Sequence, residues 1–148
     1  MLKYSELCSY KNIEQVFGNL RGVLLLFESK LNNGHWTCLK KLNNGIICFY
    51  DSYGFIPDDQ LEYTNKQFRI DNNMNYPYLT RLLYNTKYPI DYNHYRVQKM
   101  KNGINTCGRY VAIFLKYDNI DCDTFSEWLL NQNDNPDITI TKLTEPYL

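Results

Sequence analysis

Short apolar runs separated by polar turns dominate the first half of the chain, which is the pattern of strands joined by tight connections. Val23 to Phe27 is a continuous apolar run of strand length and predicts a buried strand. His35 to Lys41 and Ile46 to Asp51 predict two more strands. The turn signal Asn43-Asn44-Gly45 lies between these two, so they are expected to form a hairpin.

A longer apolar segment marks the second half of the chain. Thr106 to Tyr117 is apolar on nearly every side and predicts a helix in the middle of a domain. Weaker patterns predict three more helices: Tyr10 to Phe17 with Ser9 as N-cap, Tyr76 to Tyr84 with Pro77 in its first turn, and Thr124 to Leu130. Further strands are expected at Tyr92 to Gln98 and Ile138 to Leu143. The segments Asp58 to Asn75 and Lys99 to Asn105 are expected to be irregular. The expected fold is α+β, with a mixed, mostly antiparallel sheet packed on a buried helix.

Length and charge narrow the class of protein. The 148 residues suit a single domain, 1–148, and the formal net charge is zero, which argues against a general nucleic-acid binder. Met1 to Leu20 contains no apolar core of a signal peptide, and no apolar run is long enough to cross a bilayer, so we expect a soluble protein without a membrane partner. A small basic cluster, which we interpret as a solvated loop, consists of Arg96, Lys99, Lys101 and Arg109.

The cysteines point away from disulfides and metals. Their number is odd, their spacing is wide and no CxxC pair occurs, so neither a disulfide framework nor a thiolate zinc site is expected. Only two histidines are present, so we expect no metal and no cofactor, and a reducing compartment. The five are Cys8, Cys38, Cys48, Cys107 and Cys122.

Cys107 is the candidate nucleophile. It lies at the start of the predicted apolar helix, where the helix dipole lowers the pKa of a thiol, and a nearby imidazolium would lower it further. The following Gly108 allows a substrate backbone to approach closely. On its own, Cys107 would be interpreted as a buried structural cysteine. The other candidate residues favour the nucleophile.

His35 is the candidate base and Asp51 the carboxylate that orients it. His94 is a weaker candidate, because no carboxylate lies on a paired strand. An odd-length hairpin loop places His35 and Asp51 on the same face of the sheet, and the loop Leu42 to Asn44 would set them directly opposite each other. A two-residue turn at Asn44-Gly45 would place them on opposite faces. Alternatively, Asp51 only caps the turn that follows it.

Gln98 is the candidate side chain for an oxyanion hole, acting with the backbone N–H of Cys107. An ordinary surface glutamine is an equal interpretation from spacing alone. Asn102 and Asn105 are the alternative amides, because the interval from Gln98 to Cys107 is long.

These residues, in this order, resemble the adenovirus-proteinase (adenain) and SUMO-protease superfamily of cysteine peptidases. The similar segments are Gly34-His35-Trp36, Phe49-Tyr50-Asp51-Ser52, and Gln98 followed by Asn102-Gly103 and Cys107-Gly108. The resemblance implies a papain-like core in permuted order, with His35, Asp51, Cys107 and Gln98 as catalytic residues. It also implies that Trp36 and Gly108 bind substrate in a narrow channel that admits Gly and other small residues before the scissile bond. The interval between Gln98 and Cys107 is longer than is usual in the family.

The expected activity is that of a cysteine endopeptidase (thiol protease). The short chain resembles a viral or virophage (Mavirus-like) capsid-maturation protease, which would act on viral structural precursors in the host cytoplasm or within the virion, as a monomer. A peptide or nucleic-acid activator is left open, and the zero net charge gives it no support. The alternatives are a ubiquitin- or SUMO-type isopeptidase, an acetyltransferase of the His-Asp-Gln-Cys type, and an inactive module that binds protein tails.

Overall fold

A five-stranded mixed sheet lies at the centre of the computed structural model, which describes residues 1–31, 33–101 and 103–145. The inner pairs β2–β3 and β3–β4 are antiparallel, whereas the outer pairs β1–β2 and β4–β5 are parallel. The prediction of a mostly antiparallel sheet therefore holds for the two longest ladders and not for the edges. The strands, in spatial order, are β1 (Leu2–Lys3), β2 (Gly22–Lys30), β3 (Asn33–Lys41), β4 (Ile47–Tyr50) and β5 (Ile90–Tyr92).

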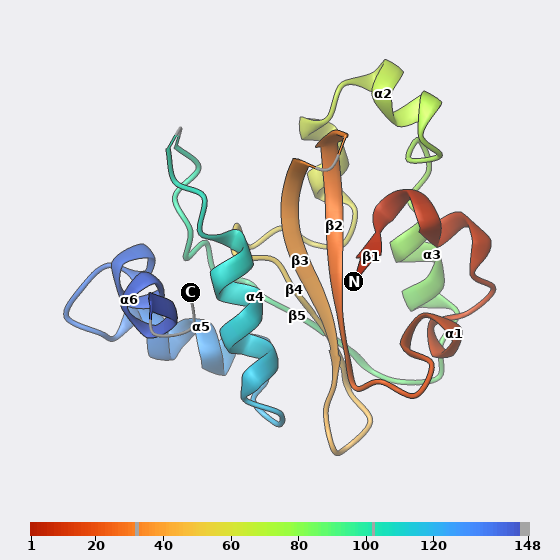
Figure 1. Ribbon diagram of the computed structural model, residues 1–148. Helices are drawn as coiled ribbons and strands as arrows, with labels where there is room; N and C mark the ends of the chain where they lie inside the picture. Colours follow the sequence, from red (N-terminus) through yellow and green to blue (C-terminus); the bar gives the residue numbers. More distant parts are fainter. Residues whose placement is uncertain (32, 102, 146–148) are drawn as a thin grey trace.

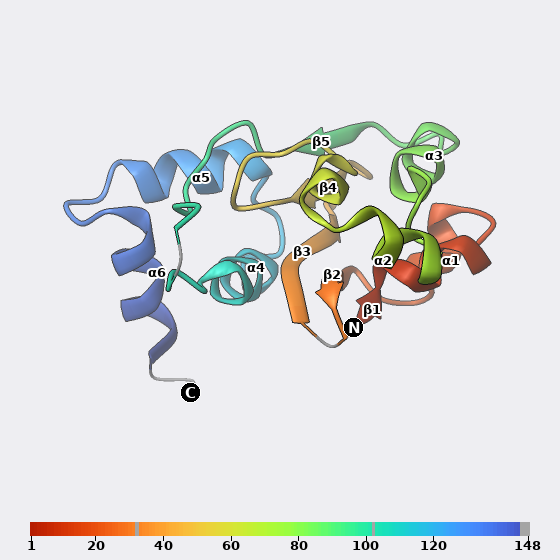
Figure 2. The ribbon, with the colours of Figure 1, turned by 90° about the horizontal axis from the view of Figure 1, so that it is seen from above.

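Helices cover both faces of this sheet, which is compatible with the expected α+β class. Figure 1 shows α4, α5 and α6 on one face and η1, α1 and α3 on the other, and the view from above in Figure 2 agrees. The helical elements are η1 (Tyr4–Ser9), α1 (Ile13–Phe17), η2 (Asp59–Tyr63), α2 (Lys66–Asp71), α3 (Tyr78–Tyr84), α4 (Cys107–Lys116), α5 (Cys122–Leu130) and α6 (Pro136–Thr144). None of the helices in the described ranges has the length and apolar character needed to cross a membrane.

Two hydrophobic cores form because β3 and β4 are buried on both faces. Leu39 and Phe49 belong to the core on the side of η1, α1 and α3. Tyr50 and Phe114 belong to the core beneath α4, where their rings stack with centroids 4.6 Å apart. Strands covered on both faces are apolar at successive positions, which explains the continuous apolar runs in the sequence.

The β3–β4 hairpin has a different register from the one predicted. Cys38 pairs with Tyr50 and Lys41 with Ile47, so the loop spans residues 42–46. This loop has an odd number of residues, which confirms the prediction that His35 and Asp51 share a face. The two are offset along the strands, however, and are not directly opposite, because the loop is two residues longer than the predicted Leu42 to Asn44.

The predicted strand Ile138 to Leu143 is wrong, because this segment lies within α6. The alternating Ile-Thr-Ile-Thr pattern favours a strand. The N-terminal signals decide otherwise: the Asn135 side chain accepts a hydrogen bond from the backbone N–H of Ile138 at 3.0 Å, and Pro136 occupies the first helical position.

The predicted strand Tyr92 to Gln98 is also largely wrong, since β5 ends at Tyr92. Beyond β5, side-chain hydrogen bonds replace strand pairing. The Asn93 amide donates to the carbonyls of Asp51 and Tyr95, each at 2.7 Å. Local side-chain bonds of this kind compete with a strand ladder.

The remaining differences concern element ends and the segment expected to be irregular. Asp58 to Asn75 contains η2 and α2. Helix α1 begins at Ile13, with Asn12 rather than Ser9 as its N-cap. Pro77 is the N-cap of α3 rather than part of its first turn. Ends of elements are weakly specified by sequence, because several polar residues in a row can serve as caps.

Candidate active site

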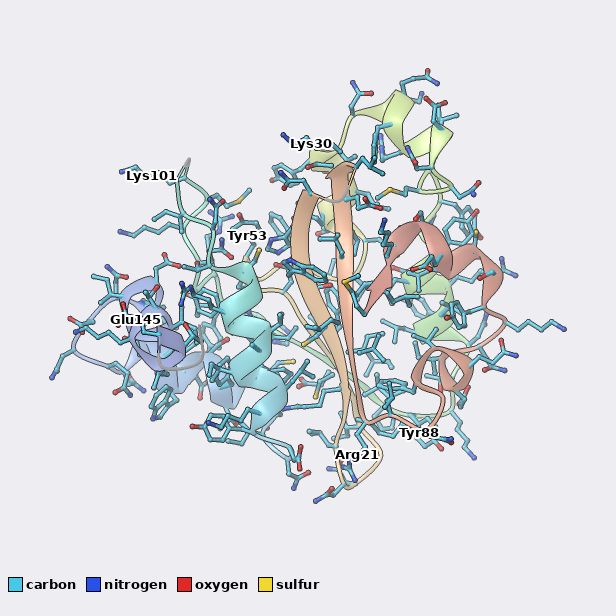
Figure 3. The ribbon with its side chains drawn as sticks, viewed as in Figure 1. Arg21, Lys30, Tyr53, Tyr88, Lys101 and Glu145 are labelled. Atoms are coloured by element: carbon cyan, nitrogen blue, oxygen red, sulfur yellow. The ribbon has the colours of Figure 1, made fainter. Side chains whose placement is uncertain are left out.

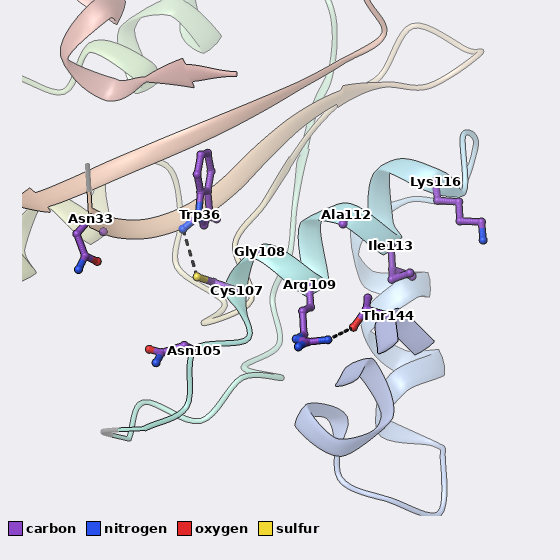
Figure 4. A pocket seen from close by; sticks show the side chains of 11 residues that line it. Asn33, Trp36, Asn105, Cys107, Gly108, Arg109, Ala112, Ile113, Lys116 and Thr144 are labelled. Atoms are coloured by element: carbon purple, nitrogen blue, oxygen red, sulfur yellow. Dashed lines mark hydrogen bonds between the residues drawn. The ribbon is translucent and has the colours of Figure 1, made fainter. Parts of the chain in front are cut away.

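The first turn of α4 presents Cys107. The backbone N–H of Trp36, on β3, donates a hydrogen bond to the Cys107 Sγ at 3.4 Å (Figure 4). Cys107 is partly buried, and as the first residue of α4 it lies among backbone N–H groups that have no partner within the helix. Such N–H groups favour negative charge, so this position favours the thiolate.

His35 and Asp51 form a buried pair beside this thiol. The Nε2 of His35 lies 2.8 Å from the Oδ1 of Asp51, and both side chains are almost completely buried. His35 precedes Trp36, whose N–H bonds to the Cys107 Sγ, and its side chain interacts with that of Cys107 closely enough to raise the pKa of His35. Because Asp51 occupies Nε2, Nδ1 is the ring nitrogen left for the thiol. The structure thus brings together the three residues that the sequence predicted for nucleophile, base and orienting carboxylate.

Gly34 allows the strand to place His35 at this point. A Cβ added at Gly34 would lie 1.9 Å from the carbonyl oxygen of Phe27 on β2, so no larger residue fits. Gly34 pairs with Glu28 next to an irregularity in the β2–β3 ladder between Glu28 and Lys30. The glycine beside the candidate base therefore has a structural cause in the close approach of β2.

The turn after β4 holds both the carboxylate and the imidazole. The backbone N–H of Tyr53 donates to Asp51 Oδ1 at 2.8 Å, and Gly54 N–H donates to the Asp51 carbonyl at 2.9 Å. Asp51 therefore caps its turn and also orients His35, so the two interpretations of this residue are compatible. The Tyr53 ring stacks on the His35 imidazole, with centroids 4.3 Å apart and an angle of 11° between the planes. Figure 3 shows Tyr53 between the start of α4 and the strands.

The electrostatics favour an ion pair between thiol and imidazole. Burial alone would lower the pKa of His35, but the Asp51 charge and hydrogen bond and the contact with Cys107 raise it to about 9. Burial alone would raise the pKa of Cys107, but the hydrogen bond and charge of His35, with the N–H groups of Trp36 and Gly108, lower it. Near neutral pH, these opposite shifts favour the thiolate–imidazolium form.

We expect iodoacetamide to modify Cys107 faster than any other cysteine at pH 6 to 7, because the ion pair preserves the thiolate where an ordinary thiol is protonated. The rate should fall by about tenfold or more at neutral pH in His35→Ala, since the imidazolium that stabilises the thiolate is lost. Peptide mapping by mass spectrometry measures both, with the exposed Cys8 as the internal reference. Equal rates for Cys8 and Cys107 would contradict the ion pair.

Gln98 is buried next to the same turn, which argues against the ordinary surface glutamine. Ser52 Oγ donates to Gln98 Oε1 at 2.6 Å, and the Gln98 Nε2 lies 3.4 Å from the Ile104 carbonyl oxygen. Backbone N–H groups of Val97 and Gln98 both donate to the Ser52 carbonyl, at 2.9 and 3.0 Å. The oxygen end of the amide is therefore fixed by Ser52, and its N–H end faces the loop that leads to Cys107.

We expect Gln98→Glu to lower kcat by about 10²–10³-fold, because it keeps the shape and the Ser52 bond but removes the N–H donors of an oxyanion hole. Ser52→Ala should cost less, since the amide remains and loses only its anchor. Steady-state kinetics with a fluorogenic peptide measures both effects, and circular dichroism checks folding. A silent Gln98→Glu together with a crippled Asn105→Ala would place the donor in the loop.

Asn105 and Asn102 are the alternative amides for the oxyanion hole, and the structure describes only the first. Asn105 is exposed and lines the groove next to Cys107. Asn102 lies outside the described residues. Gln98, which is buried and anchored, is the better-supported candidate of the two that are described.

A groove of about 650 Å³ runs from Cys107 along the exposed face of α4 (Figure 4). Trp36 and Gly34 border one end, Ala112 and Ile113 line the middle, and Thr144 on α6 borders the other side. Helix α4 is therefore less completely buried than its composition predicts, because the face that carries Ala112 is exposed.

Asp137 on α6 is a site-supporting residue that the sequence did not reveal. Its carboxylate accepts hydrogen bonds from Thr106 Oγ1 at 2.7 Å, Tyr110 OH at 2.9 Å and the Lys99 N–H at 3.1 Å. These bonds join both ends of the loop between Gln98 and Cys107 to one buried side chain. The only signal in the sequence is the helix start Asn135-Pro136-Asp137, and the alternating pattern that follows it favours an edge strand instead.

His94 does not take part in this constellation. It is exposed, and its Nδ1 lies 2.7 Å from Asp123 Oδ2 on α5. The structure therefore places His35, and not His94, beside the thiol.

Comparison with known proteins shows a viral relationship. No family model matches the chain. It is 38% identical over 126 residues to "Uncharacterized protein V9" of Sputnik virophage, an alignment that covers 85% of this chain and 72% of V9. The chain therefore belongs to the same family as this virophage protein, which supports the expected viral origin. A solved structure, the central domain of the uncharacterized Lpg1148 protein from Legionella pneumophila, aligns at 12% identity over 99% of this chain and 82% of that one, with a TM-score of 0.39. That similarity is too low to carry an argument.

Proposed function

We propose that this protein is a cysteine peptidase, with Cys107 as nucleophile, His35 as base and Asp51 as its orienting carboxylate. The observation that carries the proposal is a buried His35–Asp51 pair beside a thiol at the N-terminus of α4, whose Sγ accepts a hydrogen bond from the N–H of the adjacent Trp36. A structural cysteine needs neither a charged imidazole nor a buried carboxylate behind it. Groups with opposite pKa shifts in one site are typical of catalysis.

The chemistry follows from the protonation states. The Cys107 thiolate attacks the carbonyl carbon, and His35 donates its Nδ1 proton to the leaving amine as the C–N bond breaks. A water molecule then loses a proton to His35 and attacks the acyl-enzyme, which releases the carboxylic acid and the thiolate. Gln98 Nε2 and the N–H of Cys107 would bind the oxyanion in both steps.

We further propose that the fold is a papain-like core in permuted order, of the adenain and SUMO-protease type. Support comes from the chain order: base and carboxylate come from the β3–β4 hairpin, and amide and thiol follow in the second half. Papain-like enzymes of the ordinary order place the nucleophile helix first. Residues of the His-Trp, Asp-Ser and Cys-Gly segments each contact another residue of the site described above.

The preferred substrate carries small residues before the scissile bond. A Cβ added at Gly108 would lie 3.4 Å from the Trp36 ring, so the ring and the start of α4 border a narrow passage beside the thiol. The substrates that we propose are viral structural precursors, which the resemblance implies, and the virophage relative supports a viral origin. Maturation of capsid or virion proteins, by a monomeric enzyme, is the corresponding role.

We expect Trp36→Ala to raise cleavage after Leu or Phe by at least about tenfold relative to cleavage after Gly, because removal of the ring widens this passage. Kinetics on a peptide series that varies only the residue before the scissile bond measures the change. Trp128, an exposed tryptophan on α5, provides the matched control, and Trp128→Ala should leave the ratio unchanged. A wild-type enzyme that already prefers Leu or Phe would contradict the narrow passage.

The proposal is tested with electrophilic peptides that end in a Gly vinyl ester or, separately, with a ubiquitin-like tail carrying the same group. A covalent adduct on Cys107 with either probe supports a peptidase. Preference for the short peptide indicates an endopeptidase, and preference for the folded tail indicates an isopeptidase. Acyl transfer from acetyl-CoA without adduct formation would indicate an acetyltransferase. Tight binding of tails without any adduct would indicate an inactive binding module.

A further inference from the structure

A second group of reactive side chains lies away from the groove. The Sγ of Cys48 on β4, a carboxylate oxygen of Asp91 on β5 and the Sγ of Cys122 at the start of α5 all lie within 4.8 Å of one another. Both thiols are completely buried, whereas Asp91 is partly exposed. None of the three lines the groove at Cys107.

The carboxylate of Asp91 contacts both cysteines, and the Cys122 thiol donates to the Phe49 carbonyl at 3.4 Å. The Asp91 Oδ2 accepts a hydrogen bond from Cys48 Sγ at 3.6 Å and another from the backbone N–H of Cys122 at 3.0 Å. In a tetrahedral zinc site, Zn–S bonds of about 2.3 Å and Zn–O bonds of about 2.0–2.2 Å place the ligand atoms about 3.5–3.8 Å apart. Small side-chain adjustments would therefore bring the three atoms to ligand distances.

Lys40 supplies a buried positive charge at the same place. It pairs with Cys48 across the β3–β4 ladder, is 2% exposed, and its Nζ donates to the carbonyls of Phe114, Tyr117 and Ile120 at 3.1, 2.9 and 2.7 Å. Buried charge is costly unless it is balanced. Asp91 and Lys40 carry opposite formal charges, which cancel while both cysteines are neutral.

The charge remains balanced when a divalent metal enters. Two thiolates, one carboxylate, one ammonium and Zn²⁺ also sum to zero, and the two thiol protons go to solvent. Zinc binds cysteine as the thiolate, so the metal must displace the proton of each thiol. Lys40 thus neutralises the single negative charge that a zinc site with two cysteines and one aspartate would otherwise leave in the core.

We propose that Cys48, Asp91 and Cys122 form a structural zinc site, with a water as fourth ligand on the side where Asp91 reaches solvent. The metal would join β4, β5 and α5 and would take no part in the chemistry at Cys107. The expectation of no metal rested on the absence of closely spaced ligands. Here the ligands are brought together by strand pairing and helix packing. The proposal is independent of the peptidase activity.

Titration of the reduced, metal-free protein with Co²⁺ tests the site. We expect one equivalent to produce the visible bands of tetrahedral cobalt and a sulfur-to-cobalt charge-transfer band, both removed by Zn²⁺. Cys48→Ser and Cys122→Ser should each lose most of the charge-transfer band, and Asp91→Asn should weaken binding by about tenfold or more. Cys8→Ser and Cys107→Ser are the matched controls and should bind like the wild type.

X-ray absorption at the zinc edge of the wild-type protein does not depend on whether the variants fold. We expect two sulfur ligands at about 2.3 Å together with lighter ligands at about 2.0–2.2 Å. A shell of nitrogen and oxygen alone, a cobalt spectrum lost only in Cys107→Ser, or no binding at all would overturn the proposal. A disulfide that peptide mapping locates between Cys48 and Cys122 after purification without reductant, in a chain that binds no zinc once reduced, would show that the two thiols form a redox pair instead.

Discussion

Cys107→Ala should abolish turnover of every peptide substrate, because no other side chain in the site can form the acyl-enzyme. We expect kcat to fall by about 10⁵-fold or more, which is the size of the loss when the nucleophile is removed from a set of cooperating catalytic residues. Substrate binding should persist, since Trp36 and Gly108 still border the groove. The measurement combines a fluorogenic assay with binding of a labelled peptide, and the expected result is a stable, uncleaved complex.

Two variants make this test specific. Cys8→Ala removes an exposed thiol on η1 and should retain full activity. Cys107→Ser keeps a nucleophilic oxygen in the same position, but a hydroxyl is much less acidic than a thiol. The serine variant should therefore be almost as inactive as the alanine variant. Wild-type turnover in either Cys107 variant would rule out nucleophilic catalysis at this residue and, with it, the proposed function.

The hairpin and the nucleophile helix could be predicted because their signals are local and strong. The turn Asn43-Asn44-Gly45 and the apolar runs beside it identify β3 and β4, and the dense apolar segment after Cys107 identifies α4. Parity along the strands places His35 and Asp51 on one face for any odd-length loop, and the observed loop is odd, whereas the sequence also left a two-residue turn open. Parity was not enough for their exact offset, which depends on the five-residue loop and on contacts with the rest of the sheet.

What could not be predicted depends on contacts between distant segments. Tyr53 stacks on His35 only because the turn after β4 folds back over the strand end. Asp137 reaches the loop before Cys107 only because α6 packs beside α4. Local pattern even misled at α6, where alternating β-branched residues were outweighed by an N-cap and a proline in the first turn.

His35→Ala should be nearly as damaging as loss of the thiol, with a decrease in kcat/KM of about 10⁴-fold, since both proton transfer and the thiolate partner disappear. Asp51→Asn should cost only about 10²-fold. The reason is local: the Tyr53 N–H that donates to Asp51 Oδ1 would hold the oxygen of the introduced amide in the same position, where it still accepts from His35 Nε2–H. The imidazole therefore keeps its tautomer and loses only the neighbouring charge.

The pH profile separates this orienting role from a purely structural one. Imidazolium is lost as the pH rises through the pKa of His35, which the Asp51 charge helps to raise to about 9. Without that charge the pKa falls, so the alkaline limb of kcat/KM in Asp51→Asn should move to lower pH. The other His–Asp pair provides matched controls, because His94→Ala and Asp123→Asn remove an exposed contact of 2.7 Å and should leave both rate and profile unchanged. An Asp51→Asn enzyme with an unshifted alkaline limb, or a His94→Ala enzyme as inactive as His35→Ala, would contradict the assignment of base and carboxylate.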